Sequence, residues 1–169
     1  MPFAFKFGKE PEKNTTYLVE ERKINGYHIL GHDKKTPLFE IIGKTATTRG
    51  RYRIRRSEDA VALGTITREQ VNTEYTFKGA LDETIGSVKI HDNSIHLKVG
   101  NDEYKGKISN RAQTFEFHDK KDKLCLTIDK KILSIRDAYR IQGVENFPYL
   151  ISQMLAVVID DYFHQGPTE

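Results

Sequence analysis

The sequence is poor in the residues that stabilise small secreted folds: its 169 residues include one cysteine, five prolines and no tryptophan. A single cysteine, Cys125, excludes an intramolecular disulfide framework. Cys125 lies in the run Lys-Leu-Cys-Leu-Thr-Ile-Asp, which favours a small strand residue over a catalytic nucleophile. The first residues also lack a basic segment followed by an apolar stretch, so no secretory signal is expected and a cytoplasmic location is the default.

An excess of charge of one sign is absent too. The chain has 27 Lys and Arg residues against 24 Asp and Glu residues, a formal net charge of +3. This balance does not indicate bulk affinity for nucleic acid. Mixed charges on 30% of the residues are typical of a soluble, folded chain. The length predicts a single domain over residues 1–169 with a sizeable core.

The motifs of catalytic and metal sites are also missing. There is no Gly-rich phosphate loop before a helix, no Gly-x-Ser-x-Gly motif and no cysteine–histidine cluster. His28 and His32 have a spacing that clamps a metal when it occurs on a helix, but here the pair straddles Gly31 at a strand end. The carboxylates are scattered among turns beside lysines. We therefore expect no enzyme activity, no cofactor and no metal site.

What the chain does have is one almost wholly apolar segment near its end, residues 147–164. Residues 154–159 include no polar side chain, so every side of a helix would be apolar there, and such a helix must be surrounded by protein. A membrane span needs about 20 apolar residues. This run is shorter, contains Ser152 and Gln153, and ends in two aspartates. We therefore predict a core helix over residues 147–165 rather than a span.

The limits of this helix are marked by local signals. Asn146 can cap its start, and Pro148 suits its first turn. At about 100° per residue, the polar residues Gln153, Asp160 and His164 fall on one narrow stripe. Asp160 and His164 are four residues apart, and we interpret them as a polar rim at the end of the helix rather than a functional pair.

The rest of the chain is typical of short strands separated by turns. Residues 1–15 are interpreted as an irregular lead-in, and residues 16–142 as strands spaced by about 8–12 residues. Polar turn sequences such as Asn25-Gly26 and Asp129-Lys130-Lys131 separate them. The predicted strands are 16–21, 26–30, 38–43, 47–56, 60–67, 74–78, 84–91, 94–99, 103–108, 113–118, 123–128, 132–136 and 138–142.

Together these elements predict a mainly β fold, a closed antiparallel barrel of about twelve strands around a central hydrophobic C-terminal helix. Closing the sheet removes its edges. A barrel of that size has an interior too wide for its own side chains, and the apolar helix is the right size to fill it. The candidates for the inner face are Val88, Ile90, Ile95, Leu97, Phe115, Phe117, Leu124, Leu126, Leu133 and Ile135.

Residues 123–142 and 146–161 resemble the end of the LURP-one-related proteins, which belong with the phospholipid scramblases to the Tubby C-terminal-like superfamily. The matching features are a basic hairpin, Asp137 and Tyr139 on one strand, and an apolar helix that closes in Ile-Asp at 159–160. The close match covers a minority of the chain, and the earlier strands agree in spacing and number. The resemblance implies a twelve-stranded barrel around a hydrophobic helix, in agreement with the fold predicted from the residues.

The resemblance also implies roles other than catalysis. Tubby-like domains bind phosphoinositide headgroups, and scramblases act at membranes with calcium. Scramblases carry an acidic, calcium-associated segment before the terminal helix, where this chain has Asp137 followed by Tyr139 and Arg140. Ca²⁺ prefers about 6–8 oxygen ligands, which Asp137 and the distant Glu145 do not supply, so lipid scrambling is not expected.

The most distinctive surface feature is the run Arg-Gly-Arg-Tyr-Arg-Ile-Arg-Arg at residues 49–56. Alternate residues of a strand share a face, so four guanidiniums about 6–7 Å apart would form a stripe that binds inositol phosphate, anionic lipid or a nucleic-acid backbone. The stripe consists of Arg49, Arg51, Arg53 and Arg55, and Lys44 and Arg68 could extend it. The alternative is a solvated face whose arginines pair with nearby acids, namely Glu58, Asp59, Glu69 or Glu74.

Two classes of function remain open. The leading hypothesis is a binding module that docks an anionic lipid headgroup on the arginine stripe, at a membrane surface. The alternative is a protein–protein interaction or scaffold domain without a small ligand, which predicts a contiguous exposed apolar patch. Nucleic acid is not an expected partner, because the net charge is modest and few aromatic residues are candidates for base stacking.

Overall fold

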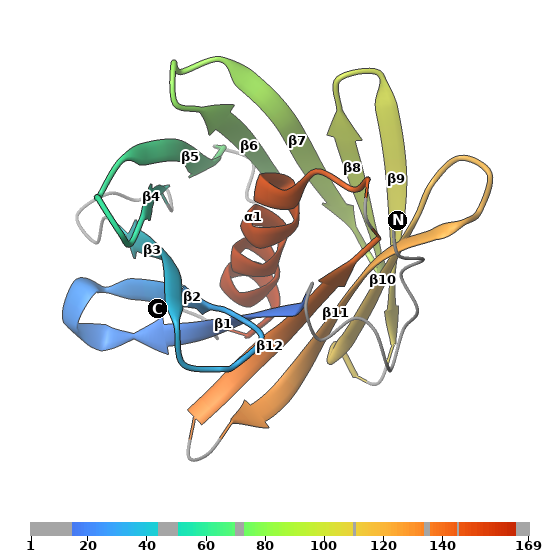
Figure 1. Ribbon diagram of the computed structural model, residues 1–169. Helices are drawn as coiled ribbons and strands as arrows, with labels where there is room; N and C mark the ends of the chain where they lie inside the picture. The colour runs from blue at the N-terminus through green and yellow to red at the C-terminus, as the bar shows by residue number, and fades with distance from the viewer. Residues whose placement is uncertain are drawn as a thin grey trace, which may run out of the picture.

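A computed structural model describes residues 15–43, 51–69, 73–109, 111–133, 136–144 and 146–164. Within these residues, twelve antiparallel strands form a closed barrel, and the chain then runs into a helix inside it (Figure 1). The strands are β1 (Thr15–Glu21), β2 (Gly26–Leu30), β3 (Pro37–Gly43), β4 (Arg51–Arg56), β5 (Ala62–Arg68), β6 (Glu74–Gly79), β7 (Thr84–His91), β8 (Ser94–Val99), β9 (Asp102–Ser109), β10 (Thr114–His118), β11 (Leu124–Leu133) and β12 (Arg136–Gly143). The predicted fold class is confirmed.

Each strand pairs with its neighbours in sequence, and the barrel closes where the first strand meets the last. β1 pairs antiparallel with β12, so that Thr15 lies opposite Gln142. The sheet consequently has no free edge, the usual site of unwanted strand pairing. A short 3-10 helix, η2 (Arg22–Ile24), joins β1 to β2.

One predicted turn is wrong. The sequence Asp129-Lys130-Lys131 was expected to separate two strands, but β11 runs through it without a break. Asp129 lies opposite Arg140 of β12, and the Arg140 guanidinium Nη2 is 3.1 Å from the Asp129 carboxylate. The charged residues therefore fit within a strand because a residue of the neighbouring strand pairs with Asp129. Without that neighbour, the same residues are typical of a turn.

The helix is shorter and starts later than predicted. α1 spans Tyr149–Ile159, and a π-helical turn, η3 (Asp160–His164), follows it. The expected cap at Asn146 is wrong, because the N-cap position belongs to Pro148 and no side chain caps the first turn. Proline fixes φ near the helical value and has no N–H to satisfy, so it can begin the helix alone.

The core lies between α1 and the inner face of the barrel. All residues from Ile151 to Ile159 are buried, and they pack against inward side chains from the surrounding strands. The helix approaches the wall closely at Gly64, where a Cβ would lie 2.3 Å from the Lys78 carbonyl oxygen and 3.0 Å from Met154 Cε. Glycine at this position therefore leaves room for both the neighbouring strand and the helix.

Most of the predicted inner-face residues are confirmed. Those that are buried at the inner face are Val88, Ile90, Ile95, Leu97, Phe115, Phe117 and Leu126. Leu124, by contrast, is only partly buried. Ile135 and the side chain of Leu133 lie outside the described residues.

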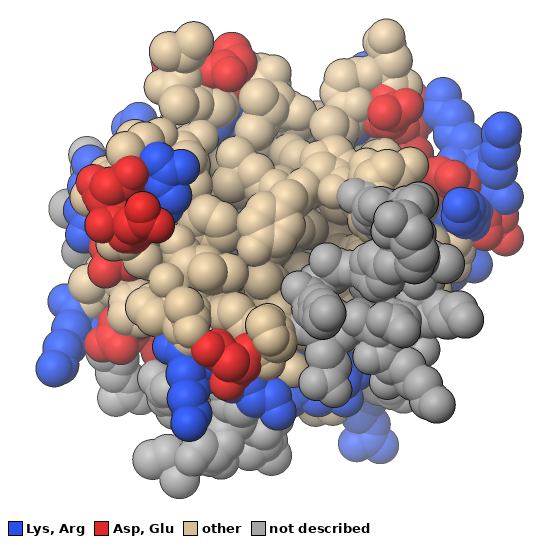
Figure 2. All heavy atoms as spheres, in the orientation of Figure 1, with Lys and Arg blue, Asp and Glu red and all other residues tan. Residues whose placement is uncertain are grey.

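One face of the molecule has a largely uncharged centre and a charged periphery. Figure 2 shows uncharged residues across the middle of one face, with Lys, Arg, Asp and Glu gathered around it. Among the helices of the described residues, none combines the length and the apolar character that crossing a bilayer requires.

Candidate functional site

Strand β4 presents the arginines of the predicted stripe on the outer wall of the barrel. Tyr52 and Ile54 point inward and are buried, whereas Arg51 and Arg53 are exposed and Arg55 is partly exposed. This alternation is the one expected for a strand with one face in the core. The other two proposed members of the site, Lys44 and Arg49, lie outside the described residues.

The acidic partner of the stripe is not one of those anticipated. Glu40 of β3 lies directly opposite Arg55, and the Arg55 Nε donates to its carboxylate at 2.7 Å. Asp59 instead pairs with Arg56, at 2.9 Å. Glu69 accepts a hydrogen bond from the Thr76 hydroxyl. The register between β3 and β4 places Glu40 opposite Arg55. This register cannot be predicted from the number of residues that connect the two strands.

Arg53 has neutral neighbours on both sides. It lies opposite Ile42 of β3 and Thr65 of β5, and among the described residues it forms no hydrogen bond or ion pair. Thr65 in turn lies opposite Lys78 of β6, so one row across the wall reads Arg53, Thr65, Lys78. Neighbouring strands are about 4.8 Å apart. The backbones of Arg53 and Lys78, one strand away from Thr65 on either side, are therefore separated by about twice that distance. Lys78 could not be predicted as a neighbour of Arg53, because it lies 25 residues away in the chain and is placed near Arg53 only by the pairing of β5 with both β4 and β6.

A shallow groove of about 230 Å³ lies beside this row, and we call it the outer groove. Arg53, Arg55 and Thr65 line it together with the turns that follow β4 and β6. Each connection carries an exposed apolar side chain: Val61, just before β5, is 45% exposed, and Leu81, within the turn after β6, is 88% exposed. Cationic and apolar groups therefore adjoin one another at this part of the wall.

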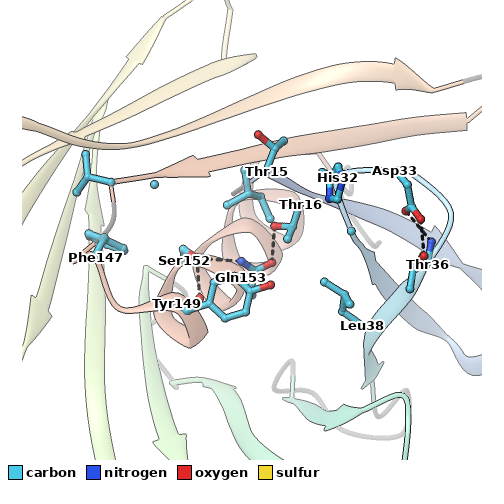
Figure 3. Close-up of a pocket in the computed structure, with 14 residues that line it drawn as sticks. Thr15, Thr16, His32, Asp33, Thr36, Leu38, Phe147, Tyr149, Ser152 and Gln153 are labelled. Carbon is cyan, nitrogen blue, oxygen red and sulfur yellow. Dashed lines mark hydrogen bonds between the residues drawn. The ribbon is translucent and has the colours of Figure 1, made fainter. Parts of the chain in front are cut away.

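A second, larger cavity of about 490 Å³ opens at the barrel end where α1 begins, and we call it the mouth pocket (Figure 3). Its apolar lining includes Leu38, Ile141 and Phe147, and its polar lining includes Thr16 and Gln153. The helical period predicts Gln153 on a polar stripe of the helix, but nothing in the sequence indicates a pocket beside it. Thr16, the strand residue that is bonded to Gln153, lies 137 residues away in the chain, so no local pattern indicates this contact.

A chain of hydrogen bonds runs along one wall of the mouth pocket (Figure 3). The Thr16 hydroxyl donates to Gln153 Oε1 at 3.0 Å, and Gln153 Nε2 donates to the Ser152 hydroxyl at 2.9 Å. The Ser152 hydroxyl donates to the Tyr149 carbonyl oxygen at 2.6 Å. Gln153 is 1% exposed and Ser152 is 4% exposed, so these are buried polar groups in an otherwise apolar helix.

The opposite end of the helix carries a carboxylate cluster bound by tyrosines from the barrel wall. Asp160 accepts hydrogen bonds from the hydroxyls of Tyr27, at 2.6 Å, and Tyr139, at 2.8 Å. Asp161 accepts from two further tyrosine hydroxyls, and Arg68 Nη1 lies 3.3 Å from its carboxylate. Those two tyrosines are Tyr52 and Tyr75. The helix end is thereby attached to the wall, while the side chain of His164 lies outside the described residues.

Burial and the two carboxylates keep three of these tyrosines, Tyr27, Tyr52 and Tyr75, neutral. Desolvation raises the pKa values of Tyr27, Tyr52 and Tyr75 far above that of free tyrosine, and the charges of Asp160 and Asp161 raise them further. A neutral hydroxyl keeps its proton for the carboxylate. The cluster is therefore a set of structural hydrogen bonds rather than a source of reactive phenolates.

Histidine and cysteine side chains of the described residues lie apart from this cluster. His28 Nε2 lies 3.7 Å from a Glu40 carboxylate oxygen. No group of three or more His, Cys, Asp or Glu side chains in the described parts of the chain is arranged to hold a metal ion. Burial raises the pKa of the Cys125 thiol, which disfavours the thiolate that a nucleophile needs.

Comparison of the chain with protein-family models and with curated proteins finds no match. The outer groove and the mouth pocket are therefore interpreted from their own chemistry.

Proposed function

We propose that the protein is a non-enzymatic binding module that docks the phosphate of an anionic lipid headgroup at the outer groove. The observation that carries this proposal is the position of Arg53, exposed between Ile42 and Thr65 with no acidic partner among the described residues. A guanidinium binds phosphate through two parallel hydrogen bonds, and Thr65 is positioned to contribute a hydroxyl. The Lys78 ammonium lies 3.8 Å from the exposed Asp82 carboxylate, and a bound phosphate would replace that carboxylate as its partner.

Two exposed apolar side chains, Val61 and Leu81, support a membrane-bound phosphate over a soluble one. They belong to the two connections whose other residues line the outer groove. Apolar side chains enter the interfacial region of a bilayer, while nearby cations contact anionic headgroups. Peripheral docking at a membrane follows as part of the same proposal.

The resemblance to LURP-one-related and Tubby-like proteins is consistent with this function, because Tubby-like domains bind phosphoinositide headgroups. Membership of that superfamily is proposed on two grounds: the residue pattern from 123 to 161 and a barrel built around a hydrophobic helix. We also propose a cytoplasmic location, peripheral at the membrane.

Vesicle co-sedimentation tests the proposal. The full chain is mixed at low salt with neutral phosphatidylcholine vesicles, or with vesicles that also contain phosphatidylserine or a phosphoinositide. Binding to the anionic vesicles is expected to weaken as salt is raised. The double variant Arg53→Gln/Lys78→Gln is expected to bind about 30-fold more weakly, because each cation near the surface contributes about 1 kcal/mol.

A matched control separates a site from general charge. Lys105→Gln/Lys107→Gln removes the same charge from exposed positions on β9, away from the outer groove, and is expected to have a much smaller effect. Equal losses in the two double variants, or no binding of the parent chain to anionic vesicles, would contradict the proposal.

Leu81→Ser tests the membrane contact separately. Because Leu81 is 88% exposed, this change is expected to leave the fold intact. It should weaken vesicle binding without changing the affinity for a soluble inositol phosphate.

A protein-binding scaffold without a small ligand remains the second candidate. Four large apolar side chains of the described residues are exposed, on separate segments: Val61, Leu81, Tyr149 and Tyr162.

A further inference from the structure

We infer that the mouth pocket is a second binding site, for a neutral amphipathic molecule with an acyl chain and a carbonyl headgroup. This site is separate from the outer groove, so the inference does not rest on the proposed function. Its volume of about 490 Å³ falls within the range of small-molecule sites, about 300–1,000 Å³.

The headgroup is indicated by an unused donor of Gln153. A glutamine amide has two N–H donors. One of them donates to the Ser152 hydroxyl, and among the described residues the other has no acceptor. The Gln153 side chain is 1% exposed and lines the pocket (Figure 3). A buried donor without an acceptor is costly, and a ligand carbonyl oxygen in the pocket would satisfy it.

The position of Gln153 is fixed by its other bonds. Thr16 of β1 donates to Oε1 and Nε2 donates to Ser152, so the free N–H is the second one on Nε2. Ser152 is itself committed to the Tyr149 carbonyl oxygen. The amide therefore presents its donor without rearrangement, which lowers the entropic cost of binding.

The apolar body is indicated by the opposite walls. Leu38, Ile141 and Phe147 line the pocket, and two of its aromatic rings are held by rings outside it. Tyr149 packs on Phe39, with ring centroids 5.8 Å apart, and Phe147 packs on Tyr104, at 5.1 Å. Preformed apolar walls with few polar groups are typical of sites for lipid-like ligands.

The charge of the ligand follows from Asp33 at the pocket rim. Hydrogen bonds from Thr36 and from the Lys35 amide lower the pKa of Asp33 to about 2, so the carboxylate is ionised at neutral pH. Its negative charge disfavours a fatty acid anion. The described lining of the pocket includes no lysine or arginine, and its one histidine, His32, is exposed beside Asp33. A neutral carbonyl compound, such as a fatty amide or a glycerol ester, fits better.

Nuclear magnetic resonance titration of the ¹⁵N-labelled full chain tests the inference. Octanamide is the amide probe, glycerol monooctanoate is the ester probe, and octanoate is the charged comparison. We expect saturable shifts of the Ser152 and Gln153 signals, including the Gln153 side-chain amide, with either neutral probe. Octanoate is expected to bind at least tenfold more weakly. An equal affinity for octanoate would overturn the assignment of a neutral ligand.

Two variants address the two halves of the site. Gln153→Leu removes the donor at similar volume and should weaken octanamide binding about tenfold. Gly31→Val narrows the pocket: a Cβ at Gly31 would have its nearest neighbours at 3.7 Å and beyond, so there is room for it. It should weaken binding at least tenfold. Leu81→Ser changes an exposed turn residue that does not line the pocket and should leave binding unchanged.

Three results would overturn the inference. They are the absence of saturable shifts at the solubility limit of octanamide, unchanged affinity in a folded Gly31→Val variant, and shifts confined to residues outside the pocket. If Gln153→Leu fails to fold, Gly31→Val still decides whether the pocket is the site.

Discussion

At the scale of single residues, two adjacent aspartates join the core helix to the barrel wall. Asp160 and Asp161 together accept four tyrosine hydroxyls that come from β2, β4, β6 and β12. The Asp161 side chain is 7% exposed, so its charge depends on these donors and on Arg68. A buried carboxylate is tolerated only when it is paired and hydrogen-bonded in this way.

The first prediction concerns Asp161. Asp161→Asn keeps the shape but removes the charge that accepts two tyrosine hydroxyls and faces Arg68, so the free energy of unfolding should fall by about 2–4 kcal/mol. Urea denaturation measures it. The control is Asp82→Asn, whose side chain is 80% exposed and 3.8 Å from Lys78. This control should change stability by less than about 0.5 kcal/mol, and an equal effect of both changes would contradict a structural role for Asp161.

The second prediction concerns alkaline pH. Burial raises the pKa values of Tyr27, Tyr52 and Tyr75 in the folded state, whereas the unfolded chain loses these protons near pH 10. Below pH 10 both states hold the protons, so this stabilising contribution is fully present. Above pH 10 the unfolded state binds fewer protons, and the free energy of unfolding falls by about 1.4 kcal/mol per pH unit for each tyrosine.

Urea denaturation between pH 9 and pH 12 measures this slope. Tyr27→Phe removes one of the three titrations and should reduce their combined slope by about a third. The same variant should lose about 1–2 kcal/mol at neutral pH, because Asp160 loses a donor. A slope above pH 10 that is identical in the parent chain and the variant would show that Tyr27 titrates normally.

One side of each of these contacts was predictable from the sequence, but the partner was not. The helical period placed Gln153 and Asp160 on one polar stripe, and the structure shows Gln153 in a buried hydrogen bond and Asp160 in a partly buried one. Their partners, Thr16 and Tyr27, are 137 and 133 residues away in the chain. No local pattern specifies which strand faces which side of the helix, so the partners could not be predicted.

At the scale of elements, the helix is the centre of the core. Its residues from Met154 to Ile159 are 0% exposed, so each of them contacts the surrounding wall. Polar groups occur only at its two ends, in the mouth pocket and in the tyrosine cluster. The position of the helix along the barrel is thus fixed by hydrogen bonds, while its middle is held by packing alone.

The third prediction tests this packing. Leu155→Ala should lower the free energy of unfolding by about 2–5 kcal/mol, because the closed wall cannot collapse onto the space that is left. Leu81→Ala, at a position that is 88% exposed, should have little effect. Chemical denaturation compares the two variants. A small effect of Leu155→Ala would mean that the wall relaxes around the helix.

Most strands were predictable because each has one buried and one solvated face, which produces alternation in the sequence. The ranges predicted for β7 and β8 match the observed strands residue for residue. β11 was divided wrongly because its charged residues are stabilised by β12, a partner that local analysis does not consider. The acidic partner of Arg55 was missed for a similar reason, since the register between β3 and β4 is a property of the pair.

At the scale of the whole molecule, the barrel and the helix require each other. A closed sheet of twelve strands encloses a space that its own side chains do not fill. The helix fills that space, and its apolar surface is covered only by the barrel. We therefore expect the two parts to fold and unfold as one cooperative unit.

The fourth prediction follows from this dependence. A chain that ends after Gly143 retains every strand but lacks the helix, and it should show no cooperative thermal or urea transition. Circular dichroism and calorimetry measure this, with the full chain as the reference. A sharp transition in the shortened chain would show that the barrel is stable without its helix.

The order of elements also bears on synthesis. The helix follows all twelve strands, so during translation the strands leave the ribosome first. At about 5–20 residues per second, they wait seconds for the segment that completes their core. In that interval the inward aromatic and aliphatic side chains lack the helix they pack against, and β1 can pair with β2 but not yet with β12. Nascent chains of this protein should therefore depend on chaperones that shield apolar strands until the helix has emerged.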